Sequence, residues 1–171
     1  GFEHFGIQPD IVTMAKGIAS GLPLSALAAS ADLMSRWPTG SHGGTYGGNA
    51  VACAAGVATI AAMHEEGLIE NAAAQGQVLM AGLRKLQEEH PEIGDVRGLG
   101  LMIGTEFTTP DGDPWTERSK AVAKAALAEG LMLLTCGTYD NIIRWIPPLV
   151  ITESQAKDAL GMFERALVKS A

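Results

Sequence analysis

The sequence predicts an α/β chain that ends in a small α+β domain. Short apolar, β-branched runs alternate with longer segments in which apolar residues recur at helical spacing. After residue 90 the predicted order is strand, helix, strand, strand, helix. A length of 171 residues with 47% hydrophobic residues is enough to bury a core of ordinary size. We therefore expect a globular chain of one or two domains.

The first predicted elements lie on either side of a lysine. Residues 10–14 form an apolar, β-branched run after a proline, which predicts a short buried strand, and Lys16 follows its end. Glycines and a proline predict a loop before a second strand over residues 24–29. A short helix that Ser30 or Asp32 could cap comes next.

A glycine-rich segment, residues 38–48, precedes two predicted helices. Its five glycines would lose much entropy in a regular element, so we expect a loop that a further contact orders. Apolar residues then recur at helical spacing from Asn49 to about Glu66. Gly67 ends that helix, and a second helix runs to about His90, where a proline follows.

The remaining sequence predicts strands and two helices. Residues 96–107 predict a strand pair or one bent strand, and further strands are expected at residues 131–135 and 142–146. Between them, residues 116–129 predict an amphipathic helix that Gly130 ends.

The last helix has the clearest start signal. Thr152, with Gln155 three residues on, predicts a capping box. One face of this helix is apolar and is expected to be buried; it comprises Ala156, Ala159, Leu160, Phe163 and Leu167.

Charge and composition exclude several classes of function. The net charge of −7 and the lack of any basic run argue against a nucleic-acid partner. No apolar stretch predicts a membrane span or a signal peptide. Cys53 and Cys136 have apolar neighbours and no Cys-x-x-Cys spacing, which predicts reduced, buried thiols in the cytoplasm. The four histidines are scattered, so we predict no metal site.

Lys16 is the first candidate for chemistry. A lysine at the end of an apolar strand is partly desolvated, and desolvation favours the neutral amine that attacks a carbonyl carbon. The glycines that follow leave room for a bulky group such as a cofactor. From local sequence alone, a structural lysine that extends its amine from a sheet edge into solvent is the more common case.

Two further positions could bind anions. The loop around Thr45 offers a hydroxyl and backbone N–H groups near a helix start, which suits a phosphate, although a connector without ligand is an equal alternative. Arg144 lies between Ile143 and Trp145, so its charge needs a carboxylate partner from the protein or from a substrate. For Arg97, before Gly-Leu-Gly, a structural ion pair is the default.

Four segments of the sequence form a joint pattern: QPDIVTMAKG around Lys16 with GLPLSA behind it, HGGTYGGN around Thr45, GDVRGLGLM, and NIIRWIPPL around Arg144. In this order they resemble the signature segments of the class III pyridoxal-phosphate aminotransferases, over essentially the whole chain. Within that family, the run LTCG that leads to Asn141 and Arg144 is most similar to 4-aminobutyrate aminotransferases.

The resemblance implies a fold and an activity. It implies fold type I, with residues 1–66 as the end of the large α/β/α cofactor-binding domain and residues 67–171 as a linking helix and the small α+β C-terminal domain. It also implies transfer of an amino group from an ω-amino acid, such as 4-aminobutyrate, to 2-oxoglutarate. Ornithine, acetylornithine and β-alanine aminotransferases share most of these motifs and are alternatives.

The resemblance also implies a role for each candidate residue. Lys16 would form the internal aldimine with pyridoxal 5'-phosphate and then move a proton as a base. Thr45, beside Gly44, would bind the cofactor phosphate across the interface of a homodimer or higher oligomer. Arg144 would bind the carboxylate of the amino acid or 2-oxo acid.

The sequence departs from the family in length. Family members are more than twice as long, and their N-terminal part carries a phosphate-binding loop, an aromatic residue that stacks on the ring and an acid at the pyridine nitrogen. We therefore expect this chain to be a C-terminal portion that could lack turnover by itself. The rival hypothesis is a non-catalytic fragment or dimerisation module.

Overall fold

The computed structural model describes residues 1–170 and divides the chain into two compact units. The N-terminal unit is Gly1–Glu66 and the C-terminal unit is Gly67–Ala171. Each unit is described by itself. No helix within the described residues is both long and apolar enough to cross a membrane.

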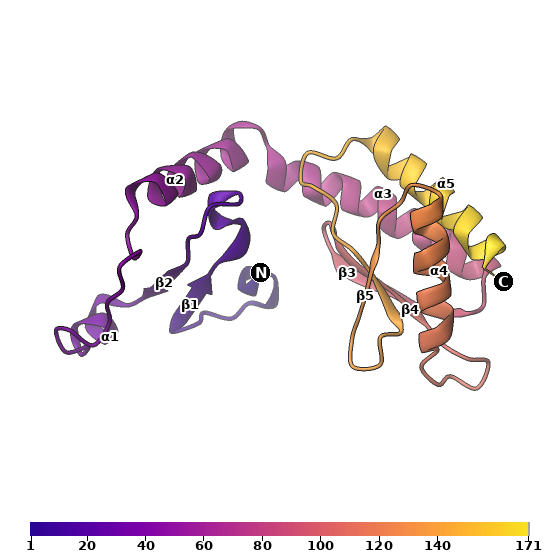
Figure 1. The fold of residues 1–171 in the computed structure, drawn as a ribbon, viewed down its shortest axis with the longest axis horizontal. Coiled ribbons are helices and arrows are strands. Elements are labelled where there is room, and N and C mark those ends of the chain that lie inside the picture. Colours follow the sequence, from indigo (N-terminus) through magenta and orange to yellow (C-terminus); the bar gives the residue numbers. More distant parts are fainter. Residues whose placement is uncertain (171) are drawn as a thin grey trace. The chain divides into compact units, whose positions relative to one another are not determined.

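The N-terminal unit contains two strands, which pair antiparallel, and four helical segments (Figure 1). Its elements are η1 (Phe2–Phe5), β1 (Ile11–Met14), η2 (Lys16–Ala19), β2 (Ala26–Ala29), α1 (Ala31–Ser35) and α2 (Ala50–Glu65). Both predicted strands and the glycine-rich loop are confirmed, and the predicted loop between the strands contains the 3-10 turn η2. Ser30 caps α1, since its hydroxyl accepts a hydrogen bond from Leu33 N at 3.2 Å.

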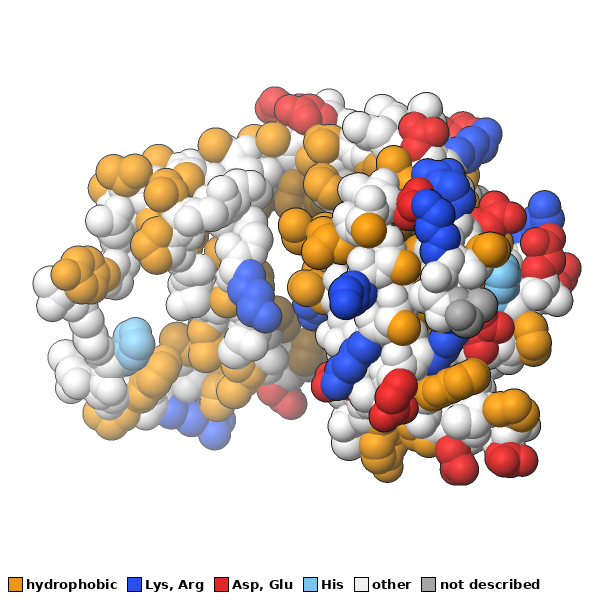
Figure 2. Space-filling model, turned by 45° about the vertical axis from the view of Figure 1, so that its right-hand side comes forward, with side chains coloured by type: hydrophobic (Ala, Val, Ile, Leu, Met, Phe, Trp, Pro, Cys, Tyr) orange, Lys and Arg blue, Asp and Glu red, His pale blue; other side chains and the backbone are white. Residues whose placement is uncertain are grey.

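The prediction that the first strand is buried is wrong for this chain. Ile11 is 51% exposed and Met14 is 39% exposed, because a two-stranded ribbon has no further strand or helix over these side chains. Apolar side chains also reach the surface along α2, where Val51 and Val57 are 68% and 71% exposed. Figure 2 shows these apolar groups over the N-terminal unit, with few charged side chains between them.

The C-terminal unit is a four-stranded antiparallel sheet with three helices. Its elements are α3 (Leu68–Glu89), β3 (Ile93–Leu99), β4 (Met102–Phe107), α4 (Thr116–Ala128), β5 (Leu134–Cys136), β6 (Ile142–Trp145) and α5 (Glu153–Lys169). The strand order is β3-β4-β6-β5. As predicted, Gly67 lies between the two long helices with a left-handed φ of 62°, and the segment 96–107 is a strand pair rather than one bent strand.

Helices cover one face of this sheet. Helices α3 and α4 contact the strands, and α5 packs against both helices (Figure 1). The buried core includes Leu79 of α3, Ile103 and Phe107 of β4, and Phe163 of α5, whose ring meets Trp145 edge-on at 5.0 Å between centroids. The capping box of α5 is present, with Thr152 and Gln155 bonded in both directions. The opposite face of the sheet carries no helix of this unit and is called the open face below.

One predicted strand is shorter than expected. Residues 131–135 were predicted as a strand, but β5 begins at Leu134. The reason is the end of α4: Gly130 is left-handed, with a φ of 90°, and the N–H of Leu131 donates to the carbonyl of Ala126 at 2.8 Å. The chain therefore completes a helix cap before it can join the sheet.

Candidate active site

Lys16 begins the 3-10 turn η2, two residues after β1 ends. Its φ is +58°, in the left-handed region that non-glycine residues rarely adopt. Ser20 and Gly21, at the end of the same turn, have positive φ values of 45° and 109°. Strained backbone of this kind is concentrated at functional sites.

The Lys16 side chain is exposed and makes no ion pair within residues 1–170. The expected partial desolvation is thus wrong for this chain, because the side chain of Lys16 stays exposed although its turn packs on α2. The amine is nevertheless available, since no carboxylate of the described chain neutralises it.

The turn that carries Lys16 is anchored on α2 through small residues. Ala19 of η2 and Ala52 of α2 are the buried apolar residues of this unit, at 1% and 2% exposure. A Cβ on Gly56 of α2 would lie 2.8 Å from Leu24 Cδ2 and 3.5 Å from the carbonyl oxygen of Ile18. Gly56 therefore permits the close approach that holds the lysine turn in place.

Thr45 lies in the glycine-rich loop just before α2. Its hydroxyl and its N–H make no hydrogen bond in the described chain, whereas Gly47 N donates to Gly44 O at 3.3 Å. A Cβ on Gly44 would meet nothing within 4 Å, so the space beside Thr45 is open. The loop can therefore offer free donors to an anion.

The first turn of α2 contributes few free N–H groups to an anion site at this loop. Asn49 Oδ1 accepts hydrogen bonds from Val51 N at 3.1 Å and Ala52 N at 3.0 Å. This side chain caps the helix and already satisfies two of its first N–H groups. The loop donors around Thr45, rather than the helix end, remain for a ligand.

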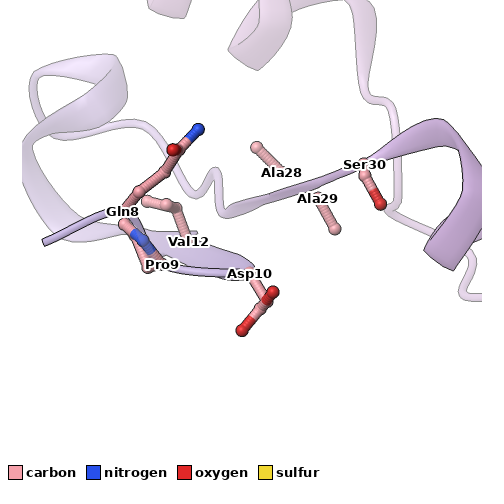
Figure 3. A pocket seen from close by; sticks show the side chains of 7 residues that line it. All are labelled: Gln8, Pro9, Asp10, Val12, Ala28, Ala29 and Ser30. Carbon is pink, nitrogen blue, oxygen red and sulfur yellow. The ribbon is translucent and has the colours of Figure 1, made fainter.

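The N-terminal unit also has an open hollow of about 490 Å³, which does not involve the candidate residues. Gln8, Asp10, Val12 and Ser30 are among its lining residues (Figure 3). It lies at the Ile11–Ala29 end of the ribbon, whereas Lys16 follows the other end, where Met14 pairs with Ala26.

Arg144 lies in β6 of the C-terminal unit. Its neighbours Ile143 and Trp145 are buried at 0% and 3% exposure, so alternation places Arg144 on the open face. Its Nε is buried without a hydrogen-bond partner, and no ion pair in residues 1–170 includes its guanidinium. The sequence allowed either a protein carboxylate or a substrate carboxylate as the partner of Arg144. No protein carboxylate pairs with it in the described chain.

Gly104, which has no side chain, is the register partner of Arg144 on β4. In the sheet register Gly104 of β4 lies between Arg97 on β3 and Arg144 on β6, and Leu134 is the partner of Arg144 on its other side. The place of a Cβ on Gly104 is bordered by Ile142, whose Cγ2 would lie 3.2 Å from it.

Arg97 forms a structural ion pair, as the sequence predicted. Its Nη1 donates to Asp95 Oδ2 at 2.6 Å and to Glu106 Oε2 at 2.5 Å. The hydrogen bonds to Asp95 and to Glu106 raise the pKa of the Arg97 guanidinium above its ordinary value. Glu106 also accepts from Asn141 Nδ2 at 3.2 Å.

Sequence reasoning missed three residues around Arg144: Gly104, Glu106 and Asn141. The alternation of buried and exposed positions in β4 was a usable signal, but only the pairing register of β4 with β6 shows which of these residues lie beside Arg144. Lys16 and the Thr45 loop both adjoin α2 in the N-terminal unit, and Arg144 belongs to the C-terminal unit.

Other predicted features have simple outcomes. Cys53 and Cys136 are free thiols, half-buried rather than fully buried. No cluster of three or more His, Cys, Asp or Glu side chains that could hold a metal ion occurs in the described part of the chain.

Comparison with known proteins identifies the family. Residues 1–167 match the family described as class III aminotransferase. The chain belongs to the class III aminotransferases. This match confirms, at the level of the family, the resemblance seen in the four sequence segments. Members of this family depend on pyridoxal phosphate.

Individual aminotransferases match over almost all of this chain. A 4-aminobutyrate aminotransferase of Mycobacterium leprae is 44% identical over 96% of the chain, and a 5-aminovalerate aminotransferase of Pseudomonas aeruginosa is 42% identical over 94%. A solved transaminase from the marine bacterium Virgibacillus superimposes with a TM-score of 0.91 at 31% identity, covering 99% of the chain. The mixed α/β fold is therefore that of class III aminotransferase structures, of fold type I.

The match covers only part of each relative. The chain spans 37% and 38% of the length of the two curated aminotransferases and 41% of the solved one.

Proposed function

We propose that this protein transfers the amino group of an ω-amino acid, with 4-aminobutyrate as the donor, to 2-oxoglutarate. The observation that carries the proposal is Lys16: a lysine without an ion pair in the described chain, held in left-handed backbone at the start of η2 and anchored on α2. It stands at the position that the resemblance assigns to the cofactor lysine.

Residues of the N-terminal unit suit pyridoxal phosphate. Lys16 Nζ is unpaired and can attach to the aldehyde carbon of the cofactor, and the free hydroxyl and N–H of Thr45, with open space at Gly44, suit its phosphate. When bound, pyridoxal phosphate supplies an electron-withdrawing ring that stabilises negative charge on the substrate carbon. Lys16 Nζ would then serve as the base that moves a proton at the substrate carbon.

Arg144 is proposed to bind the substrate carboxylate. A guanidinium can donate two parallel hydrogen bonds to a carboxylate, and the unpartnered Nε of Arg144 leaves this capacity unused within the chain.

We also propose a domain assignment and an assembly. Residues 1–66 end the large cofactor-binding domain, and residues 67–171 form the linking helix and the small C-terminal domain. The exposed Thr45 loop then acts in the site of a second subunit of a homodimer, which also supplies the contact that orders its glycines. The free cysteines are consistent with a cytoplasmic enzyme.

The substrate class follows from the relatives' named substrates. 4-Aminobutyrate and 5-aminovalerate both have a primary amine at one end and a carboxylate at the other, and they differ by one methylene. Turnover of these two donors, β-alanine, ornithine and acetylornithine with 2-oxoglutarate separates the proposal from its alternatives. Faster turnover of ornithine or acetylornithine than of both ω-amino acids would reject the proposed donor.

Reductive labelling tests the lysine directly. After addition of pyridoxal phosphate and reduction with borohydride, peptide masses should show the label on Lys16. Lys16→Ala should lose it, and Lys85, on the exposed surface of α3, serves as the control for random labelling. Label on Lys85 but not on Lys16 would contradict the cofactor role. Label on Lys16 without turnover of any donor would favour the non-catalytic fragment.

A further inference from the structure

The open face of the C-terminal sheet places a carboxylate near Arg144. Gly104 of β4 is the register partner of Arg144, and Glu106, two residues on, is the partner of Ile142. Residues two apart in a strand point to the same face, so Glu106 and Arg144 are diagonal neighbours. Such neighbours lie about 7–8 Å apart, within the reach of two long side chains. Gly104 has no side chain, and Cγ2 of Ile142 reaches toward it, 3.2 Å from the place of a Cβ, so a contact between Glu106 and Arg144 would have to pass Ile142.

Glu106 nevertheless does not pair with Arg144. Its Oε2 accepts the hydrogen bond from Arg97 Nη1 at 2.5 Å, and its Oε1 accepts from Asn141 Nδ2 at 3.2 Å. Asn141 is 1% exposed and also donates to Phe107 O at 3.0 Å, so its position is set by the sheet. Both oxygens of Glu106 are therefore held on the side away from Arg144.

The consequence is a half-buried guanidinium without a partner. Arg144 Nε has no hydrogen bond, which is costly for a group removed from water. A released Glu106 carboxylate could satisfy it, because it is on the same face and has the opposite charge. The ion pair with Arg97 thus keeps the carboxylate of Glu106 from pairing with Arg144.

We propose that Arg97 is a positioning residue that, together with Asn141, holds Glu106 away from Arg144 and so keeps Arg144 open for a carboxylate ligand. The ligand part rests on the proposed function, in which Arg144 binds the substrate carboxylate. Arg97 itself does not touch the substrate. Its second partner, Asp95, is the register partner of Glu106 and bonds to Arg97 at 2.6 Å, but it takes no part in the Glu106–Asn141 hydrogen bond.

The first test is structural and needs neither cofactor nor turnover. In a crystal structure of the Arg97→Met variant, a Glu106 oxygen should move to within about 4 Å of an Arg144 nitrogen, the usual limit of an ion pair. Asp95→Asn is the matched control: it removes the other carboxylate from Arg97 and should leave Glu106 in place. Arg97→Lys keeps a donor for Glu106 and should also leave it there. Glu106 in its original position in Arg97→Met would overturn the proposal.

The second test measures binding of a carboxylate. Glutarate is the probe, and the NMR signal of Arg144 Nε–H, assigned through its loss in Arg144→Lys, reports its dissociation constant. Arg97→Met should weaken glutarate binding about fivefold, because Glu106 then competes for Arg144. Arg97→Met with Glu106→Gln should restore the dissociation constant to within about twofold of wild type. Equal weakening in both variants would overturn the proposal, because it would place the effect in Arg97 and not in Glu106.

These results separate the inference from the proposed function. If Glu106 pairs with Arg144 in Arg97→Met but the wild-type protein binds no glutarate, the hold on Glu106 is supported, and the substrate role of Arg144 in the proposed function fails. If Glu106 stays in place, the inference fails whatever the labelling of Lys16 shows.

Discussion

At the scale of single residues, two backbone constraints shape this chain. Lys16 adopts a left-handed conformation that costs a non-glycine residue about 1–2 kcal/mol, and the packing of its turn on α2 maintains it. In the C-terminal unit, a Cβ on Gly76 of α3 would lie 2.3 Å from the carbonyl oxygen of Gly100 in the β3–β4 turn. Helix and turn can approach this closely only because residue 76 has no side chain.

Gly76→Ala should therefore destabilise the protein. The added methyl group would force α3 and the β3–β4 turn apart, and overpacking of this kind costs about 1–3 kcal/mol in the free energy of unfolding. Gly161→Ala in α5 is the matched control, since the nearest atom to its Cβ is the flexible Arg165 Nη1 at 3.6 Å. That change should be neutral or stabilise by up to about 1 kcal/mol. Urea unfolding of both variants measures their free energies of unfolding. Equal changes in the two variants would contradict the close contact between Gly76 and Gly100.

The sequence predicted which residues are candidates for the site better than it predicted their surroundings. Lys16, Thr45 and Arg144 stood out in the sequence because their types and neighbours suit their proposed chemistry. Glu106 did not, since its importance comes from the register of β4 against β6, which no local pattern contains. The cap that Asn49 forms on α2 was likewise not predicted, although asparagine is a common cap residue.

At the scale of elements, Arg118 joins α4 to the start of β3 through a buried ion pair and to the end of α5 through hydrogen bonds. Arg118 of α4 is 7% exposed and donates to Glu92 Oε1 at 2.6 Å, to Leu167 O at 2.9 Å and to Ser170 O at 2.5 Å. The guanidinium thereby satisfies carbonyl groups that the last turn of α5 leaves unpaired. The C-terminal helix is thus fixed at its start by a capping box and at its end by an arginine.

This ion pair predicts a pH dependence of stability. Burial by itself would raise the pKa of Glu92, but the hydrogen bond from Arg118 and the charges of Arg118 and His90 outweigh it, so the pKa lies below its ordinary value of 4.5. A carboxyl group whose pKa is lower in the folded state than in the unfolded state stabilises the folded protein at pH values above the unfolded-state pKa. Its contribution is lost as the pH falls from about 4.5 through the folded-state pKa.

Glu92→Gln measures this contribution. At pH 7 the change should lower the free energy of unfolding by about 2 kcal/mol, because it leaves Arg118 buried without its carboxylate. At pH 3 the loss should be smaller, since Glu92 itself becomes protonated there. Glu89→Gln, in an exposed pair with Lys85, is the control and should change stability by less than about 0.5 kcal/mol. An equal effect of Glu92→Gln at both pH values would contradict the assignment.

At the scale of the whole molecule, the hydrophobic core belongs to one unit. Every residue of the core cluster lies between Leu79 and Leu167, in the C-terminal unit, while the buried apolar residues of the N-terminal unit are Ala19 and Ala52. Because buried apolar area is the main source of stability, the two units should differ strongly in their resistance to opening.

Hydrogen exchange should show this difference. Amides of β1, β2 and α2 should exchange about a hundredfold faster than those of α3, β4 and α5, as local opening follows local burial. Phe163→Ala removes a fully buried side chain of α5 and should cost about 3–5 kcal/mol. It should speed exchange in residues 67–170 and leave residues 1–66 unchanged. A matching loss of protection in both units would show that they unfold together.

The order and type of the elements followed from local patterns, because caps, glycines and apolar spacing act over a few residues. The capping box at Thr152, the glycine stop at Gly67 and the strands on either side of Lys16 are of this kind. Burial and pairing did not follow, because they depend on contacts between distant residues. The exposure of β1, the late start of β5 and the hold of Arg97 on Glu106 are consequences of which elements meet. Local sequence thus identified the candidate groups, while tertiary packing decided which of them have partners within the described residues.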